Sequence, residues 1–305
     1  MILIKCNLCG SERHELLFRS RDRQLKINDN LFNIVKCRDC GLVFINPQPE
    51  DDELKKYYPA SYGPYQKDDA VFKYGFFSRL ISKVVKSVKK SSRVAQKQEV
   101  SAGPAINYLD FGCGGGEQME AVRRLHPSWN LCGLDNSAFA CANTEKKGFK
   151  VFCGDALTID LPRDFFDIVN MNHVVEHLRD PMATIEKIRA SLKAGGKIVV
   201  STPNFDSLAA KIFKGYWYAT DSPRHLTLFT PQTLARLLKK NNFFIRSIEY
   251  DKYPKVEIRS FYYLFGKNDL RISPILWNIF RPVALILSLF GKTSNMKIVA
   301  EKIKT

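Results

Sequence analysis

Long apolar runs are missing from this sequence, and their absence excludes one class of protein. A membrane-spanning helix needs about 20 consecutive apolar residues, but the most apolar segment, 272–291, is interrupted by Asn278, Arg281 and two prolines. It predicts one or two short helices bent at Pro282 instead of a span. The first residues, Met1–Lys5, do not form a secretory leader, so we expect a cytoplasmic protein.

Acidic residues are also scarce, because 31 Asp and Glu stand against 47 Lys and Arg and the formal net charge is +16. The imbalance is local. Residues 104–206 carry 11 basic and 13 acidic side chains. Residues 73–97 carry 8 basic side chains and no acidic one, and residues 207–305 carry 17 basic and 6 acidic side chains. The central part of the chain is therefore nearly neutral, and the excess positive charge lies on either side of it.

The strongly basic segment 73–97 has apolar residues every four positions, from Phe76 to Val88, with lysines and arginines beside them. This spacing predicts a basic amphipathic helix, which either lies on an anionic membrane surface or packs on the rest of the protein. Its aromatic residues fall on the apolar stripe and not between the lysines, so it offers no platform for stacking bases. The pattern therefore argues against nucleic acid as the partner.

Three glycines stand out in the segment 107–118, NYLDFGCGGGEQ, which reads as an apolar strand, a tight turn and the start of a helix. Gly112, Gly114 and Gly116 stand where the backbone must turn sharply and approach a ligand that a Cβ atom would block. The dinucleotide pattern G-x-G-x-x-G is absent, because its third glycine would fall at position 117, which is Glu. The turn therefore indicates a nucleotide-type cofactor of another kind.

Strands and helices alternate regularly after this turn, which is typical of an α/β fold with an open, mostly parallel sheet and helices on both faces. Asp135, about 20 residues beyond the glycines, is placed to accept hydrogen bonds from ribose hydroxyls. The hydrophobic spacing predicts strands at 131–135, 151–155, 165–175, 197–204, 245–250 and 296–303, and helices at 117–126, 139–147, 181–196 and 230–243, the last with Thr230 as its N-cap.

The turn and the elements after it resemble the class I S-adenosylmethionine-dependent methyltransferases, whose turn reads D/E-x-G-x-G-x-G. The resemblance covers roughly residues 104–305 and implies a Rossmann-like seven-stranded sheet whose last two strands form an antiparallel edge. It also implies S-adenosylmethionine as the cofactor. On this resemblance the cofactor-binding residues are Gly112, Gly114 and Gly116 beside the methionine part, Asp110 near its amino group, Asp135 at the ribose and Asp155 at the adenine amine.

The sequence contains eight cysteines, and four of them form two C-x-x-C pairs with 27 residues between the pairs. Two such pairs can close a tetrahedral zinc site, and a segment of about 50 residues builds too small a core to do without such a stabiliser. The zinc would be structural, because all four positions are filled by protein ligands. The predicted ligands are Cys6, Cys9, Cys37 and Cys40.

Two disulfides are the competing interpretation of these pairs, but a protein without a leader is expected in a reducing compartment. A zinc module ahead of a methyltransferase domain also resembles the nucleotide-sugar C-methyltransferases, whose further C-terminal domain we do not expect here. We expect the other four cysteines to be unpaired apolar residues of the sheet domain: Cys113, Cys132, Cys141 and Cys153.

The catalytic candidates lie in H-x-x-E-H, formed by His173, Glu176 and His177 just past the fourth sheet strand. That location, where the acceptor pocket of this fold opens, excludes an inverted zinc-protease motif. The segment resembles a branch of small-molecule and RNA O-methyltransferases that carry E-x-x-E-H here, with His173 in place of the first Glu. A distant histidine completes a divalent-metal site in some members, and His225 is the expected equivalent.

Two mechanisms are compatible with these residues. In the first, His177 or His225 acts as the general base on an acceptor hydroxyl. In the second, Glu176, His177 and His225 hold Mg²⁺, Mn²⁺ or Zn²⁺, which lowers the pKa of the hydroxyl. A structural alternative is that His173 and His177 cap the helix after the strand and bond only to the backbone.

The sequence thus predicts three segments. Residues 1–60 form a zinc-ribbon-like module, residues 61–103 a basic amphipathic helical linker, and residues 104–305 a class I methyltransferase domain with an apolar cap insertion at about 252–295. The cap could dip into a bilayer, cover the active site or bury a dimer contact. Tyr216, Trp217 and Tyr218 either line the acceptor side or pack the cap.

The predicted function is O-methylation of a sugar, glycolipid or other small hydroxylated acceptor in polysaccharide biosynthesis. The cofactors are S-adenosylmethionine, a structural zinc and, in the metal-dependent mechanism, a second divalent ion. We expect a cytoplasmic location, either free or in peripheral contact with an anionic inner membrane surface. The alternatives are C-methylation of a nucleotide sugar, an RNA methyltransferase that uses the zinc module and basic helix, and a non-catalytic cofactor-binding scaffold.

Overall fold

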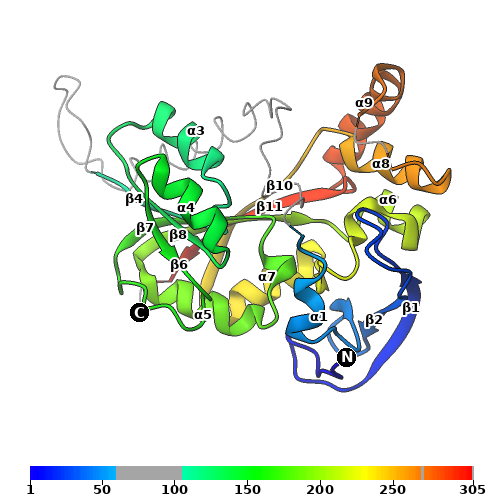
Figure 1. Ribbon diagram of the computed structural model, residues 1–305, viewed down its shortest axis with the longest axis horizontal. Coiled ribbons are helices and arrows are strands. Elements are labelled where there is room, and N and C mark those ends of the chain that lie inside the picture. Colours follow the sequence, from blue (N-terminus) through cyan, green and yellow to red (C-terminus); the bar gives the residue numbers. More distant parts are fainter. Residues whose placement is uncertain (60–104, 269–270, 304–305) are drawn as a thin grey trace.

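The computed structural model describes residues 1–59, 105–268 and 271–303 (Figure 1). The basic amphipathic helix expected at 73–97 lies outside the described residues.

A seven-stranded mixed sheet, in the order β10-β11-β8-β7-β4-β5-β6, forms the centre of the molecule. The five strands from β8 to β6 pair in parallel, whereas β11 runs antiparallel to both β8 and β10. This order confirms the predicted Rossmann-like sheet with its antiparallel edge. The strands are β4 (Asn107–Phe111), β5 (Asn130–Asp135), β6 (Lys150–Cys153), β7 (Phe166–Asn172), β8 (Leu192–Pro203), β10 (Phe243–Tyr250) and β11 (Asn295–Lys302).

Helices cover both faces of this sheet, with α3 (Glu117–Leu125) and α4 (Ala138–Lys146) on one face and α5 (Pro181–Ser191) and α7 (Pro231–Lys240) on the other (Figure 1). The start of α7 is as predicted, because the Thr230 side chain accepts from the Thr233 N–H and Pro231 occupies the first turn.

The end of α5 differs from the prediction. The helix stops at Ser191, five residues before the glycine at 196, and β8 begins at Leu192. Leu192 pairs with Phe166 of β7 and is fully buried. Pairing of this segment with β7 therefore outweighs its helical pattern.

A second, four-stranded sheet has the order β1-β2-β3-β9. Its first three strands, β1 (His14–Ser20), β2 (Phe32–Cys37) and β3 (Val43–Ile45), precede the short helix α1 (Asp51–Lys55). The fourth strand, β9 (Thr227–Leu228), comes from the chain just before α7 and pairs antiparallel with β3. Phe44 of β3 also packs in the same core cluster as Phe229 and Leu237, so the N-terminal residues share their core with the large sheet.

The segment between β10 and β11 forms two helices, α8 (Lys255–Leu264) and α9 (Pro274–Leu289), that project from one edge of the molecule (Figure 1). The apolar segment 272–291 contains one helix of 16 residues with Pro282 inside it, which is the single-helix form of the one or two short helices expected there. None of the helices within the described residues is long and apolar enough to cross a membrane.

One expectation about the cysteines is also wrong. Cys141 of α4 and Cys153 at the end of β6 form a disulfide, although both were expected to be unpaired. Cys113 and Cys132 are free and buried, as expected. The bonded pair arises because α4 packs directly against β6, which brings together two side chains that the sequence pattern assigned only to the apolar core.

Candidate functional site

The glycine-rich turn joins β4 to α3 at the carboxyl edge of the sheet. Gly112, Gly114 and Gly116 all have positive φ angles, of 76°, 53° and 82°, which residues other than glycine rarely adopt. A Cβ atom on Gly112 would lie 2.4 Å from Cγ2 of Val174. Glycine is therefore required at this position by the protein's own packing, whereas the sequence suggested a ligand as the obstacle.

Asp110, the last residue but one of β4, is buried beside this turn. Its Oδ1 accepts hydrogen bonds of 3.1 Å from the side-chain amides of Gln118 and Asn170. Burial, together with the nearby charge of Asp135, raises the pKa of Asp110 to about 7. No cationic side chain among the described residues pairs with Asp110, so an ammonium group of a ligand would fit its charge.

Asp135 and Asp155 follow the next two strands along the same edge. Asp135 ends β5, and its two carboxylate oxygens accept from the N–H groups of Gly114 and Ser137 at 2.9 Å. Asp155 is exposed two residues beyond β6, where it accepts from the Leu157 N–H at 2.7 Å. Asp110, Asp135 and Asp155 thus stand at the ends of three adjacent strands, in the order expected for one extended cofactor. Asp135 in addition fixes the glycine-rich turn.

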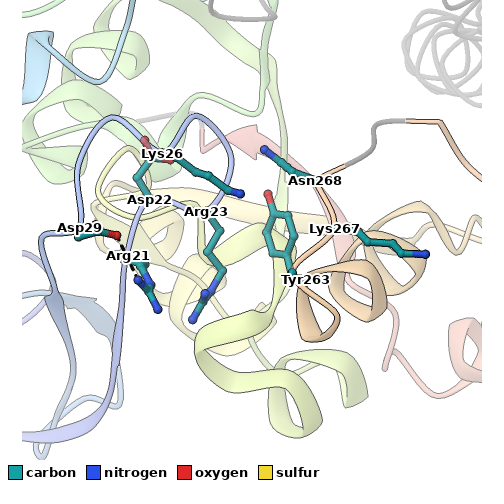
Figure 2. Close-up of a pocket in the computed structure, with 9 residues that line it drawn as sticks. Arg21, Asp22, Arg23, Lys26, Asp29, Tyr263, Lys267 and Asn268 are labelled. Carbon is teal, nitrogen blue, oxygen red and sulfur yellow. Dashed lines mark hydrogen bonds and ion pairs between the residues drawn. The ribbon is translucent and has the colours of Figure 1, made fainter.

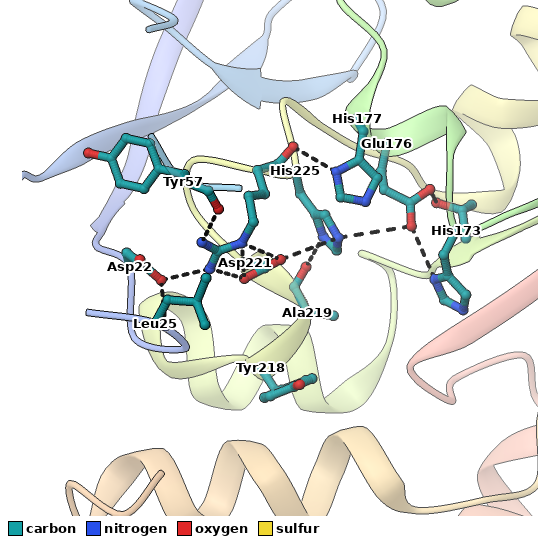
Figure 3. A network of polar contacts seen from close by, with 12 residues as sticks. Asp22, Leu25, Tyr57, His173, Glu176, His177, Tyr218, Ala219, Asp221 and His225 are labelled. Atoms are coloured by element: carbon teal, nitrogen blue, oxygen red, sulfur yellow. Dashed lines mark hydrogen bonds and ion pairs between the residues drawn. The ribbon is translucent and has the colours of Figure 1, made fainter. Parts of the chain in front are cut away.

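The histidine cluster lies beside the turn, because Val174, the neighbour of Gly112, follows His173 directly and stands two residues before Glu176. The potential ligand atoms of Glu176, His177 and His225 all lie within 4.8 Å of one another (Figure 3). Val175–His177 is a single 3₁₀ turn and not the start of a long helix. His173, with a positive φ of 55°, points away from the other two histidines and contacts Glu176 through Nδ1 at 3.1 Å.

The hydrogen bonds of the two clustered histidines fix their tautomers. Nδ1 of His225 lies 2.8 Å from the carbonyl oxygen of Ala219, and Nδ1 of His177 lies 3.0 Å from that of Arg224. A carbonyl oxygen only accepts, so each Nδ1 carries the hydrogen and each Nε2 keeps its lone pair. Metal-binding histidines are commonly held in this way.

Two pKa shifts describe the charges in the cluster. Burial acts to raise the pKa of Glu176, but hydrogen bonding and charge from His173 and charge from the two other histidines lower it to about 2. Burial and the charge of His225 lower the pKa of His177 to about 4. At neutral pH the cluster therefore contains a carboxylate and a neutral imidazole. These donors suit a divalent cation, whereas a histidine with so low a pKa is a weak base.

A buried ion-pair network lies next to His225 (Figure 3). The Arg224 guanidinium, with a fully buried side chain, donates to Asp22 and to Asp221 at 2.6 Å. Asp221 in turn lies 3.8 Å from Nε2 of His225, and the Tyr58 hydroxyl lies 3.0 Å from Nδ1 of His177. The N-terminal segment thus contributes to the surroundings of both histidines.

Several of these residues were not predicted from the sequence. Asn170 is a polar residue in the middle of the apolar strand FDIVNMN, and Asp221 and Arg224 stand three apart directly before His225; both patterns were visible signals. The aromatic residues 216–218 were expected either to line the acceptor side or to pack the cap, and Trp217 has the second role because it shares a buried cluster with Val256 of α8. Trp217 is buried and donates from Nε1 to the Ser294 hydroxyl at 3.3 Å, so it packs the core and does not face an acceptor.

The four N-terminal cysteines come together as predicted. The Sγ atoms of Cys6 and Cys40 are 3.4 Å apart, those of Cys9 and Cys37 are 3.5 Å apart, and all four lie within 4.8 Å of one another. A tetrahedral zinc ion with Zn–S bonds of about 2.3 Å needs sulfurs about 3.8 Å apart. A glycine with positive φ follows each pair, so the four thiols fit a zinc ion.

The sheet order, the glycine-rich turn and the three aspartates are typical of an α/β protein with a nucleotide-type cofactor at the carboxyl edge of its sheet. Residues 76–248, more than half of the chain, match the family model described as methyltransferase domain. The chain therefore belongs to this methyltransferase family.

Curated proteins of several organisms are similar in sequence to part of this chain. The ubiquinone biosynthesis O-methyltransferase of Bradyrhizobium sp. (strain ORS 278) is 33% identical over 168 residues, which cover 52% of this chain and 65% of that protein. An uncharacterized 37.1 kDa protein in transposon TN4556 of Streptomyces fradiae is 26% identical over 125 residues, 39% of this chain and 36% of that protein. The match therefore spans less than two thirds of these relatives' own length.

Among solved structures, a SAM-dependent methyltransferase from Archaeoglobus fulgidus aligns with 74% of this chain and 94% of its own, at 22% identity and a TM-score of 0.46.

Proposed function

We propose that this protein transfers the methyl group of S-adenosylmethionine to a hydroxyl group of a small acceptor, a sugar or glycolipid in polysaccharide biosynthesis. The observation that carries the proposal is the contact of Gly112 with Val174. This contact sets the cofactor turn directly against the segment that bears Glu176 and His177. The name of the Bradyrhizobium relative, an O-methyltransferase, agrees with oxygen as the accepting atom.

The cofactor lies along the edge defined by the three aspartates in this proposal. The Asp110 carboxylate binds the amino group of the methionine part, and the glycine-rich turn lies close beside that part. Asp135 binds the ribose, and Asp155 binds the adenine amine. As the hydroxyl oxygen forms its bond to the methyl carbon, the carbon–sulfur bond breaks and S-adenosylhomocysteine leaves. The hydroxyl proton must be removed in the same step.

Two routes are proposed for that proton, and the low pKa of His177 argues against His177 itself as the base. In the first route Glu176, His177 and His225 would hold Mg²⁺, Mn²⁺ or Zn²⁺, and the cation would lower the pKa of the acceptor hydroxyl. In the second route the hydroxyl proton passes to Nε2 of His225. Asp221, 3.8 Å away, then stabilises the resulting imidazolium.

His225→Ala tests both routes. The rate of methyl transfer from radiolabelled S-adenosylmethionine should fall by about 100-fold or more, because a general acid–base group usually contributes at least that much to the rate. Cofactor binding should stay unchanged. His126→Ala is the matched control, because His126 stacks on Trp129 at the far end of α3. Loss of activity with EDTA and recovery with one divalent cation would select the metal route. Full activity of His225→Ala would refute both.

The acceptor class is tested by transfer of the radiolabel into a host-cell lysate, followed by counting of the separated fractions. Label in glycan or glycolipid supports the proposal. Label in nucleotide sugars would establish the C-methyltransferase alternative, and label in RNA would establish the nucleic-acid alternative. Cofactor binding without label in any fraction would leave the non-catalytic scaffold.

The same proposal includes a structural zinc ion on Cys6, Cys9, Cys37 and Cys40, within an N-terminal module of residues 1–60. Residues 61–103 are the linker and residues 104–305 the methyltransferase domain, with the cap at about 252–295. This division rests on the motifs, and the shared core of the two sheets means that the module and the domain act as one folding unit.

We also propose that the cap makes the peripheral contact with an anionic membrane surface. Ala284 is the one buried residue of α9, and apolar side chains on its outer surface, such as Ile275, Ile279 and Ile286, are more than half exposed. The sequence from 258 to 295 carries five basic residues and one acidic residue. Apolar side chains framed by positive charge favour an anionic bilayer.

A further inference from the structure

A basic pocket of about 280 Å³ lies between an N-terminal loop and the end of α8 (Figure 2). Its two walls are far apart in the sequence and are tied together by the Asn268 side chain, which donates to the carbonyl oxygen of Gln24 at 2.5 Å. The pocket is lined by Arg21, Asp22, Arg23, Lys26, Asp29, Tyr263, Gly266, Lys267 and Asn268.

The two acidic residues of this pocket are already neutralised. Asp22 pairs with the buried Arg224, and Asp29 pairs with Arg21 at 3.1 Å. Arg23, Lys26 and Lys267 have no ion-pair partner within the part of the chain that the structure describes. The pocket therefore carries an excess of positive charge, and burial together with the like charge of Arg21 lowers the pKa of Arg23.

Tyr263 provides an independent sign of a ligand. The residue is only 7% exposed, and its buried hydroxyl has no hydrogen-bond partner among the residues described. Buried polar groups are nearly always hydrogen-bonded, and burial raises the pKa of Tyr263, so this hydroxyl is a protonated donor. Figure 2 shows it pointing toward the same space as the amine of Lys26 and the amide nitrogen of Asn268.

We infer that this pocket binds a phosphate or diphosphate group. Cations around an unpaired hydroxyl donor match the acceptor-only oxygens of such a group. Pockets that enclose a whole drug-sized ligand are roughly 300–1,000 Å³, so this one admits the charged part of a larger molecule. Lys267 extends away from the centre in Figure 2 and contributes charge more than contact.

The pocket is connected to the histidine cluster through buried ion pairs. Asp22, on the pocket wall, pairs with Arg224, and Arg224 also pairs with Asp221, which lies 3.8 Å from His225. The bound phosphate therefore belongs to the methyl acceptor, an assignment that rests on the proposed function. Two sources share this chemistry, a nucleoside diphosphate attached to a sugar and a lipid diphosphate carrier.

The test is calorimetric titration of the full-length protein with inorganic pyrophosphate, without cofactor or acceptor. Wild-type protein should bind, more weakly at higher salt. Tyr263→Phe should weaken binding roughly tenfold or more, the usual effect of losing a hydrogen bond to a charged group. Lys26→Ala should weaken it a few-fold, and Lys239→Ala on α7, an exposed lysine outside the pocket, should leave it unchanged.

The melting temperature of Tyr263→Phe separates binding from folding. Removing an unpaired buried hydroxyl should leave the melting temperature unchanged or raise it, so weaker binding without loss of stability supports the inference. Absence of pyrophosphate binding by wild-type protein would overturn it. Equal binding by wild-type, Tyr263→Phe and Lys26→Ala proteins would do the same.

Competition experiments then identify the source of the phosphate. Displacement of pyrophosphate by uridine diphosphate indicates a nucleotide-linked acceptor, and displacement by an isoprenyl diphosphate in detergent micelles indicates a lipid carrier. Both outcomes support the site. If pyrophosphate binds but no acceptor is methylated, the pocket stands and the proposed function fails, so the two failures are distinguishable.

Discussion

Asp110 and Gly112 are two residues apart at the cofactor edge. Asp110 is notable for its buried charge, and Gly112 for its backbone conformation. The Asp110 carboxyl group is buried beside neutral amides, and its charge lacks a cation of the protein's own within the described residues. The Gly112 backbone lies in contact with Val174 and adopts a conformation that other residues avoid.

The affinity for S-adenosylmethionine should depend on pH through Asp110. The pKa of about 7 in the free protein means that the carboxyl group must lose a proton before it pairs with the ammonium group of the ligand. Affinity should therefore rise with pH up to about 7 and fall below it, by roughly fivefold between pH 7 and pH 6. Calorimetry checks this, and Asp110→Asn should bind weakly at both values. If the affinity of Asp110→Asn still depended on pH, the dependence would come from a titratable group other than Asp110.

Gly112→Ala should destabilise the protein more than the same change elsewhere. The added methyl group meets Val174, which costs about 1–3 kcal/mol beyond the strain of a positive φ. Gly148→Ala is the control, because Gly148 has a φ of 79° but nothing within 4 Å of a Cβ atom. Chemical denaturation compares the two.

The double variant Gly112→Ala/Val174→Ala tests the cause of that difference. It should recover most of the extra free energy of unfolding, because the truncated side chain no longer meets the new methyl group. Equal destabilisation by Gly112→Ala and Gly148→Ala would show that backbone strain alone requires the glycine.

The short strand β9 links the N-terminal cysteines to the rest of the fold. This two-residue strand joins the N-terminal sheet to α7, and Cys6, Cys37 and Phe44 lie in one core cluster with Leu237. Loss of the metal should therefore affect more than a peripheral module.

The purified protein should contain one zinc ion per chain by atomic emission, and Cys37→Ser should lose it. Because the core is shared, the melting temperature of the entire protein should fall by several degrees, the size expected for a loss of a few kcal/mol. Cys153→Ser, which alters a sulfur outside the cluster, should keep its zinc. A zinc-free protein with an unchanged melting temperature would contradict the structural role.

The sequence predicts regular elements well where one pattern decides them. The apolar runs and caps gave the seven strands and the start of α7, and the cysteine spacing gave the four-thiol cluster. The N-terminal part of β8 was missed because its pairing with β7 depends on a neighbour far away in the sequence. The contact of Asp22 with Arg224, 202 positions apart, has no local pattern at all, since it depends on how the two sheets pack.

The histidine cluster and its surroundings are assembled from three segments that lie far apart in the sequence. Asp22 and Tyr58 come from the N-terminal segment, Glu176 and His177 from the centre, and His225 from the chain before α7. The cap adds a different property, since α9 extends from the edge of the large sheet with most of its apolar surface exposed (Figure 1). Such a surface on a helix needs an apolar partner.

Vesicle flotation tests whether that partner is a bilayer. The protein should float with vesicles of phosphatidylcholine mixed with phosphatidylglycerol, less with phosphatidylcholine alone, and less in high salt, because apolar burial and positive charge act together. Ile279→Glu and Ile286→Glu, at positions 59% and 58% exposed on α9, should reduce flotation by about tenfold or more, since each removes apolar contact and adds repulsion.

Leu125→Glu is the matched control for this experiment. Leu125 is 47% exposed at the end of α3, so it carries the same kind of change on a different helix and should leave flotation intact. Sedimentation of the same variants supplies the competing outcome. A dimer that dissociates in Ile279→Glu, with flotation absent throughout, would assign the exposed surface of α9 to a second copy of the chain and would refute the membrane contact.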